Sequence, residues 1–450
     1  MVIVHERVLQ SGGNLNNGSN AGVGYLNGNN ASSNVSWNIA SRNLLVKRNN
    51  VFYDRASWQN TQPHHFSVSS KCENSVITKV KKGNTLKRYG NLFSKISHKQ
   101  NILNAHNKAK KGKSEYSAVK YVEANLTSCI DEINEELENR TYETSDYEID
   151  TRIERGKERE IYKLPYFKDR IVHHAILQVI EPILSETYIK DTYQSIKGRG
   201  VHKAKDRLKE FLKDTENTKY CLKIDIKKYY PNVDNTVLKT LIRKKIKCKD
   251  TLNLVDEIID STKGLPIGNY TSQTFGNYYL SYFDHWIKEN KKIRYYIRYA
   301  DDMVFLLDNK EDLHELKKDI DKYLYENLKL TLKENWQVFP TEIRGIDFLG
   351  FRFFHKYTML RNSIKKAYMK VIKSIKKRGA TLQNINSVMA YYGWLKASDS
   401  YNLLRATVSL IVKKFYFLCS KLKIKNPLDK IVLVPKKNIN SFGNFQPSLF

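Results

Sequence analysis

The chain has 450 residues, with 77 Lys and Arg against 47 Asp and Glu and a formal net charge of +30. This length allows two or three structural units with cores of their own. So large an excess of positive charge is typical of proteins that neutralise phosphates, so nucleic acid is the leading partner class. A merely solvated basic face and an anionic membrane surface are the weaker alternatives.

Apolar and cysteine patterns exclude several other classes. No apolar run approaches the ~20 residues that span a bilayer, and residues 1–10 lack the apolar stretch of a signal peptide. The five cysteines are scattered and form no Cys-x-x-Cys pair: Cys72, Cys129, Cys221, Cys248 and Cys419. Such a pattern argues against a disulfide framework and a zinc site. We therefore expect a soluble, reduced, cytoplasmic protein without a membrane partner.

The N-terminal part differs in composition from the rest. Asn, Gly and Ser fill 20 of the 31 positions between residues 12 and 42, and a polar, basic connector follows to about residue 88. Segments that bury so little apolar surface do not form a packed core alone. Residues 1–88 are therefore predicted to be a low-complexity, flexible segment.

From Tyr89 onward the composition is that of a folded domain. Apolar residues at helical spacing predict a core-facing helix over 171–184. Residues 221–226 predict a strand, and residues 295–307 predict two short strands with 300–302 at their turn. Further on, one helix face is apolar at Ile364, Tyr368, Val371, Ile372 and Ile375. The remaining positions of that helix are mostly lysines. These lysines either contact a phosphate backbone or are simply exposed to solvent. Strands and helices without regular alternation favour the α+β class.

Three carboxylates carry the chemistry. Asp301 and Asp302 sit between apolar, strand-like runs, and Asp225 ends a third such run. Ionised carboxylates near a core are costly unless a cation holds them, and a divalent metal is the usual partner. An Asp-Asp pair alone is weak, since many hairpins turn on one. Two strands that end in acids within a basic chain predict a two-metal site for phosphoryl displacement.

Four motifs then carry a family resemblance, in the family's order. Tyr-Ala-Asp-Asp at 299–302 resembles the signature tetrad of reverse transcriptases, and residues 225–233 resemble the motif with their first catalytic Asp. Residues 264–273 resemble the loop and helix start that pack under template and incoming nucleotide, and residues 345–350 resemble the primer-grip hairpin. The resemblance covers about residues 89–420.

The resemblance implies an RNA-directed DNA polymerase with a right-hand polymerase fold. Fingers and palm would span residues 89–360, and a helical thumb with a C-terminal tail would span residues 361–450. Asp225, Asp301 and Asp302 would be catalytic and would hold two Mg²⁺ ions, with the carbonyl of Ile226 as a further ligand. The implied partners are template RNA, the RNA/cDNA hybrid and dNTPs.

The same resemblance implies a set of nucleotide-binding residues: Arg159, Lys163, Arg170, Tyr230, Ile267, Gly268 and Gln273. Tyr230 falls at the steric-gate position, where an aromatic ring excludes a 2′-hydroxyl. Arg159 matches the fingers arginine that grips the triphosphate, and Lys163 and Arg170 are nearby candidates. Gly268 would permit close backbone approach to the nucleotide. A lysine that protonates pyrophosphate often follows Leu332 in the family, but Lys333 and Asn335 leave that role open.

One loop favours a subgroup. Ile267 stands where retroviral enzymes carry Gln, and Ser272-Gln273 stands where they carry Ser-Pro. This pattern resembles the reverse transcriptases of diversity-generating retroelements, as do residues 90–96 and 392–395. Those enzymes copy a template-repeat RNA with errors opposite adenine, for replacement of part of a variable-protein gene. Low fidelity and a small basic helical accessory protein are thereby implied.

The N-terminal stretch gains a second interpretation from this subgroup. Residues 12–42 resemble the variable segment of the lectin-like target proteins, and asparagine codons begin with two adenines, which suits adenine mutagenesis. A low-complexity leader is the alternative.

Other functions stay open. A bacterial reverse transcriptase of phage defence or of a retron is one, although the retron motifs Asn-Ala-x-x-His and Val-Thr-Gly are absent. A group II intron enzyme is expected to continue into a long maturase region. A non-catalytic RNA-binding scaffold is the last alternative, and the presence of all three carboxylates argues against it.

Overall fold

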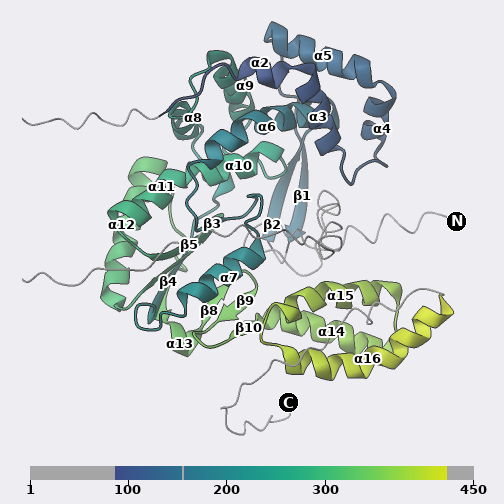
Figure 1. The fold of residues 1–450 in the computed structure, drawn as a ribbon, viewed down its shortest axis with the longest axis vertical. Helices are drawn as coiled ribbons and strands as arrows, with labels where there is room; N and C mark the ends of the chain where they lie inside the picture. The colour runs from purple at the N-terminus through teal and green to yellow at the C-terminus, as the bar shows by residue number, and fades with distance from the viewer. Residues whose placement is uncertain (1–86, 155–156, 423–450) are drawn as a thin grey trace, which may run out of the picture.

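The computed structural model describes residues 87–154 and 157–422 (Figure 1). The stretch 12–42 and nearly all of the predicted segment 1–88 lie outside the described residues, as does Cys72. The other four cysteines are free. Helices and strands follow one another irregularly, which confirms the predicted α+β class. No helix in the described ranges is both long and apolar enough to cross a bilayer.

A five-stranded sheet lies at the centre of the molecule, with strand order β3-β5-β6-β4-β7. Its strands are β3 (Thr192–Tyr193), β4 (Tyr220–Asp225), β5 (Tyr295–Tyr299), β6 (Asp302–Leu307) and β7 (Gln337–Pro340). β6 pairs antiparallel with β4 and β5, and β3 runs parallel to β5. The predicted strand at 221–226 and the predicted hairpin at 295–307 are confirmed. Asp302, expected in the turn, is the first residue of β6.

Both faces of this sheet are covered, which explains its apolar strands. Neighbouring residues of a strand point to opposite faces. On one face Tyr296 and Phe305 stack with ring centroids 4.6 Å apart and join a core that includes helix α12 (Lys310–Leu328). On the other face Ile297 and Val304 join a second core, which includes helix α7 (Val201–Phe211).

A helical layer and a hairpin make up the first part of the region predicted to hold the fingers, and they are drawn from purple to blue-green in Figure 1. The helices are α2 (Phe93–Ser97), α3 (Lys99–Ala109), α4 (Ser117–Ala124), α5 (Leu126–Asn139), the π-turn η3 (Tyr166–Arg170) and α6 (Ile171–Ser185). The hairpin pairs β1 (Glu148–Glu154) with β2 (Lys157–Lys163). Helix α6 confirms the predicted helix at 171–184, and ten of its residues are buried.

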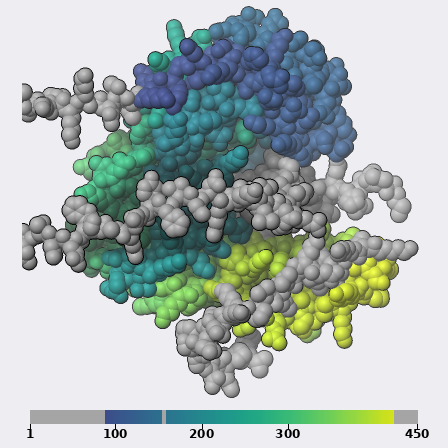
Figure 2. Space-filling view, viewed as in Figure 1, coloured from purple at the N-terminus to yellow at the C-terminus, as the bar shows by residue number. Residues whose placement is uncertain are grey.

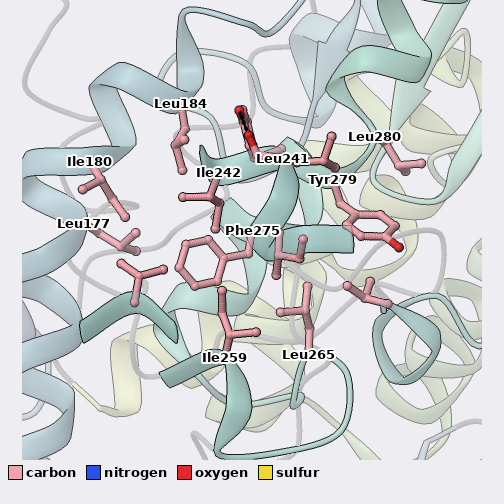
Figure 3. Close-up of a cluster of buried hydrophobic side chains, with 14 of the residues drawn as sticks. Leu177, Ile180, Leu184, Leu241, Ile242, Ile259, Leu265, Phe275, Tyr279 and Leu280 are labelled. Carbon is pink, nitrogen blue, oxygen red and sulfur yellow. Dashed lines mark hydrogen bonds between the residues drawn. The ribbon is translucent and has the colours of Figure 1, made fainter. Parts of the chain in front are cut away.

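More helices join the fingers to the sheet. They are η4 (Tyr230–Asn232), α8 (Asn235–Arg243), α9 (Lys249–Asp260), α10 (Tyr270–Tyr279), α11 (Ser281–His285) and η5 (Trp286–Asn290). Figure 3 shows Leu177 and Ile180 of α6 beside Ile242 of α8 and Phe275 of α10, all buried in one apolar cluster. Each fully buried side chain of this size contributes about 1.5–3 kcal/mol, so this cluster fixes α10 against the fingers.

A small sheet leads into the expected thumb. β8 (Ile346–Phe348) and β9 (Phe351–Phe353) form the predicted hairpin, and β10 (Thr358–Leu360) pairs with β9. The two turn residues Leu349 and Gly350 both have positive φ, 52° and 84°, as a tight type I′ turn requires. A Cβ on Gly350 would lie 2.5 Å from the ring of Trp394, so only glycine fits under that ring. α13 (Thr341–Arg344) precedes this sheet.

Three helices follow: α14 (Asn362–Arg378), α15 (Leu382–Lys396) and α16 (Tyr401–Lys421). In α14 the predicted apolar face is buried at Ile364, Tyr368, Ile372 and Ile375, with Val371 half-buried. The lysines of α14 lie on its exposed side. Figure 2 shows these helices in yellow and yellow-green at the lower side of the molecule, and helices α2 to α5 in purple and blue at the upper side.

Candidate active site

Two of the predicted carboxylates face each other across neighbouring strands. In the antiparallel pairing of β4 with β6, Asp225 is the partner of Asp302. Directly paired residues of antiparallel strands have Cα atoms about 4.5–5.5 Å apart. Asp301 lies in the turn just before β6, after Ala300, whose φ is 54°. The fold therefore brings the three acids together where the central strands β4 and β6 meet the turn at Asp301.

A buried arginine holds this turn. Arg298 is fully buried, and its Nη1 donates a hydrogen bond of 3.0 Å to the carbonyl oxygen of Ala300. Its Nε and Nη2 donate to the two carboxylate oxygens of Asp284, at 2.8 and 2.6 Å. Asp284 also accepts from Tyr296 and from Thr192. This network fixes the backbone immediately before Asp301 and Asp302, the predicted catalytic acids.

Burial perturbs the acids strongly. Asp302 is 1% exposed, and neither of its carboxylate oxygens has a hydrogen-bond partner. Its burial raises the pKa of Asp302 to about 6, against a smaller lowering by Lys223, whose Nζ lies 3.4 Å away. Burial, and next the charge of Asp225, also raise the pKa of Asp301. The raised pKa values mean that ionising Asp301 and Asp302 without a cation is costly, and a cation bound between the two carboxylates would favour their charged form.

Lys333 forms an ion pair with Asp225, the third of the acids. Its Nζ donates to Oδ1 of Asp225 at 2.5 Å, and its backbone N donates to the carbonyl oxygen of Asp225 at 2.9 Å. Ile226 is bridged to Leu332 through the same local pairing. The structure thus gives Lys333, whose role the sequence left open, a contact with a predicted metal ligand.

The residues present fit the implied metal ions. Among the residues described, no three His, Cys, Asp or Glu side chains converge on one point as a formed metal cage. Asp302 nevertheless presents two buried oxygens without a hydrogen-bond partner, one of them in an ion pair with Lys223 at 3.4 Å, and carboxylates are the hard oxygen donors that Mg²⁺ takes. Lysines supply the nearby positive charge at Asp225 and Asp302.

Tyr230, the predicted steric gate, packs beside the acids. Burial is the main cause that raises its pKa far above the ordinary value, and the charge of Asp301 is the next. A Cβ on Gly276 would lie 3.3 Å from the Tyr230 ring. Gly264 has φ 74°, and a Cβ there would lie 2.5 Å from the carbonyl oxygen of Pro231. The 264–269 loop is thus packed against the Tyr230 backbone.

The other predicted nucleotide residues come from the hairpin and this loop. Arg159 is on β2, opposite Arg152 of β1. Lys163 pairs with Glu148 at 3.0 Å and with Asp150 at 3.5 Å. The backbone approach that Gly268 permits is to Tyr162: a Cβ would lie 2.1 Å from the Tyr162 carbonyl oxygen.

Two further predicted residues belong to the same loop and helix start. The carbonyl oxygen of Ile267 accepts from the backbone N of Tyr162 at 2.8 Å, and its side chain is half-buried. Oε1 of Gln273 accepts from the hydroxyl of Ser195 at 2.6 Å. Arg170 ends η3 rather than lying on the hairpin, and its Nε is buried without a hydrogen-bond partner.

Sequence reasoning missed Arg298, Asp284 and Lys223. One signal was available, because a charged residue within an apolar strand such as 295–299 must find a partner when it is buried. That partner, Asp284, lies on another element, and no local pattern identifies it.

Residues 149–353 match the family model described as reverse transcriptase (RNA-dependent DNA polymerase). The chain contains a reverse transcriptase domain. The predicted right-hand polymerase fold of mixed helices and strands is thereby confirmed. The matched residues include β2 through β9 and all of β1 but its first residue, with Asp225, Asp301 and Asp302 among them. Its family is that of RNA-directed DNA polymerases, which are nucleotidyltransferases.

Relatives share parts of this chain. Protein YkfC of Escherichia coli (strain K12) is 24% identical over 257 residues, which make up 47% of this chain. The matched region covers 66% of that protein. Among solved structures, apo telomerase from Candida tropicalis has a TM-score of 0.40 and 15% identity, covering 62% of this chain and 59% of that one. Telomerase from Candida albicans, in complex with a TWJ fragment of telomeric RNA, has a TM-score of 0.39 and 12% identity, covering 63% and 59%.

Proposed function

We propose that this chain is an RNA-directed DNA polymerase that extends a primer with dNTPs on an RNA template. The observation that carries the proposal is the register of β4 and β6, which sets Asp225 opposite Asp302 and beside Asp301 within a reverse transcriptase domain. Acids gathered at the ends of two neighbouring central strands suit phosphoryl transfer, because charge develops on both oxygens of the displacement.

The chain's own residues divide the work. Asp225, Asp301 and Asp302, with the carbonyl of Ile226, would hold two Mg²⁺ ions. When bound, such ions stabilise the attacking and leaving oxygens of the displacement. Arg159 would contact the triphosphate from the hairpin, with Lys163 beside it. Tyr230 would exclude the 2′-hydroxyl at the sugar, because its ring packs rigidly beside Gly276.

The positive surface supports RNA and the RNA/cDNA hybrid as partners. α14 exposes lysines along its length, at Lys365, Lys366, Lys370, Lys373, Lys376 and Lys377, while its other face is buried. A row of ammonium groups at helical spacing suits a phosphate backbone, whose contacts release counterions.

Primer extension tests the activity. The full chain, a defined RNA template, a DNA primer, dNTPs and Mg²⁺ should yield cDNA, and Asp301→Asn should yield none. A wild-type chain that binds the RNA but incorporates no nucleotide would leave only the scaffold function.

We further propose that the cDNA is error-prone and serves a diversity-generating retroelement. The loop with Ile267, Gly268, Ser272 and Gln273, together with residues 90–96 and 392–395, supports this through resemblance alone. Sequencing cDNA copied from a defined RNA should show errors concentrated opposite adenine. Errors spread evenly over the four template bases would favour another bacterial reverse transcriptase.

A further inference from the structure

Lys223 lies on β4, two residues before Asp225. Because alternate residues of a strand point to the same face, its side chain lies on the face that carries Asp225. The Nζ of Lys223 is 3.4 Å from Oδ1 of Asp302, on the neighbouring strand β6. The same Nζ donates a hydrogen bond to the backbone carbonyl oxygen of Asp347 in β8. One ammonium group therefore contacts two elements at once.

These two elements belong to different sheets. Asp302 begins β6 of the central sheet, whereas Asp347 lies in the hairpin of β8 and β9. Phe348 of the hairpin and Val304 of β6 share the second core. Apolar contacts are non-directional, so they hold the hairpin against the sheet without fixing its exact position. A hydrogen bond has a preferred length and angle, so Lys223 supplies the directed contact.

The ion pair of Lys223 with Asp302 differs from the pairs on the surface. Pairs between exposed side chains contribute little, because water screens the charges and both side chains stay flexible. Here the carboxylate is 1% exposed and the lysine side chain 23%. The attraction is therefore less screened, and it holds the ammonium beside the predicted metal ligand.

A second cation holds the same hairpin from the side of α14. Nε and Nη2 of Arg361 lie 2.6 and 2.5 Å from Oδ1 of Asp347. The backbone N of Arg361, the residue just before α14, donates to the carbonyl oxygen of Gly350 at 3.0 Å. Asp347 is thus joined to α14 through its carboxylate, and to Asp302 through its carbonyl and Lys223.

We propose that Lys223 is a positioning residue for the primer, because it ties the hairpin of β8 and β9 to Asp302. This hairpin resembles the primer grip, so its position decides where the primer 3′-hydroxyl lies relative to the acids. A displacement of about 1 Å at such a place can lower the rate about a hundredfold. Lys223 acts through the hairpin and not on the reacting atoms. The place of the primer at the hairpin rests on the function proposed above.

Hydrogen exchange of the full chain in EDTA tests this tie without any reaction. Lys223→Met keeps an unbranched side chain and removes the ammonium. Amide protons of residues 346–353 should then exchange about threefold to tenfold faster, since one hydrogen bond is lost, while those of β5 stay unchanged. The matched control is Lys219→Met, which removes an exposed lysine just before β4 and should alter neither. Unchanged exchange in the hairpin, or faster exchange throughout the domain, would overturn the proposal.

Single-nucleotide primer extension measures the consequence at the 3′ end. At saturating Mg²⁺ and primer–template, Lys223→Met should lower kcat about tenfold to a hundredfold and change the KM for dNTP less than about twofold. Lys223→Arg retains a cation with several donors, so part of the lost kcat should return. A kcat for Lys223→Met equal to that of Lys219→Met would contradict the assignment.

Magnesium binding, followed by melting temperature at pH 8.5, tests the contact with Asp302. The charge of Lys223 opposes a second cation at the same carboxylate. Lys223→Met should therefore reach half of its magnesium-induced rise at a Mg²⁺ concentration about threefold to tenfold lower than the wild type. Asp347→Ala keeps the carbonyl acceptor and removes the pair with Arg361, so its midpoint should match the wild type. A higher midpoint for Lys223→Met would show a disordered site and a purely structural role.

Two outcomes keep this proposal apart from the polymerase activity. Faster exchange of residues 346–353 in Lys223→Met, in a chain that makes no cDNA, would support the tie while the polymerase proposal failed. A wild-type chain that makes cDNA, with hairpin exchange and kcat unaffected by Lys223→Met, would do the reverse.

Discussion

Arg298 and Asp284 form a fully buried, bidentate ion pair directly behind the turn that carries Asp301. The third nitrogen of the same guanidinium holds the carbonyl of Ala300, so the pair links the interior of the domain to the backbone that presents Asp301.

Arg298 is therefore predicted to be a positioning residue. Arg298→Lys cannot keep the planar, three-way contact and should lower kcat about tenfold to a hundredfold, with RNA affinity unchanged. It should also lower the melting temperature, because Asp284 is left poorly paired.

A double variant separates the two effects. Arg298→Met with Asp284→Leu removes both buried charges, so the melting temperature should recover relative to Arg298→Lys. The bond to Ala300 stays lost, so kcat should stay low. Recovery of kcat together with stability would show that Arg298 acts only through folding.

Asp302→Asn is expected to abolish dNTP incorporation while it stabilises the metal-free protein. Burial raises the pKa of Asp302 from 3.8 to about 6. Between these two values the folded chain binds more protons than the unfolded chain, so stability falls as pH rises. The asparagine side chain does not ionise, so Asp302→Asn does not lose stability in this way. In EDTA its melting temperature should therefore rise relative to that of the wild type from pH 4 to pH 6, and the difference should stay constant above pH 6.

Magnesium supplies the complementary measurement at pH 7.5. It should raise the melting temperature of the wild type and not that of Asp302→Asn, because binding to the folded state alone stabilises it. Equal magnesium shifts in both proteins would remove Asp302 from the metal site.

Tyr230→Val is expected to raise incorporation of rNTPs relative to dNTPs. The smaller side chain leaves room for a 2′-hydroxyl where the ring packs beside Gly276. Single-nucleotide extension with each substrate measures the ratio of kcat/KM values. Tyr229→Phe is the control, since the Tyr229 hydroxyl donates to the carbonyl of Gly276 and its loss should reduce stability without altering sugar choice. Unchanged discrimination in an active Tyr230→Val enzyme would place the gate elsewhere.

The exposed lysines of α14 are expected to bind the RNA/cDNA hybrid. Replacing Lys366, Lys370 and Lys373 together by Glu should weaken hybrid binding and reduce the steepness of its dependence on salt, by about 0.9 for each lost duplex contact. The same change at Lys310, Lys318 and Lys322, which are exposed on α12, is the matched control. Identical losses in the two triple variants would mean that net charge alone attracts the hybrid.

Ile267→Gln is expected to improve fidelity opposite template adenine. An apolar side chain cannot leave a polar group unpaired when the wrong nucleotide binds, whereas discrimination by hydrogen bonding is far stronger. Ile267→Val, which stays apolar, should retain the wild-type error spectrum. The measurement is sequencing of cDNA made from one defined RNA. An adenine bias that persists in Ile267→Gln would remove Ile267 as its cause.

The sequence by itself determined the local elements and the identity of the acids. Helical spacing located α6 and the buried face of α14, and apolar runs located β4 and the β5–β6 hairpin. These are local signals, because the periods of 3.6 and 2 residues state which face of an element is buried. Asp225, Asp301 and Asp302 stood out since charges rarely end apolar strands without a function.

Only the tertiary structure decided which distant element packs against each buried face. The register that sets Asp225 against Asp302, the choice of Asp284 as partner of Arg298, and the approach of Gly268 to Tyr162 all join segments far apart in the chain. Such contacts arise from packing and hydrogen bonding between distant elements, and a periodic pattern within one element does not specify its neighbour.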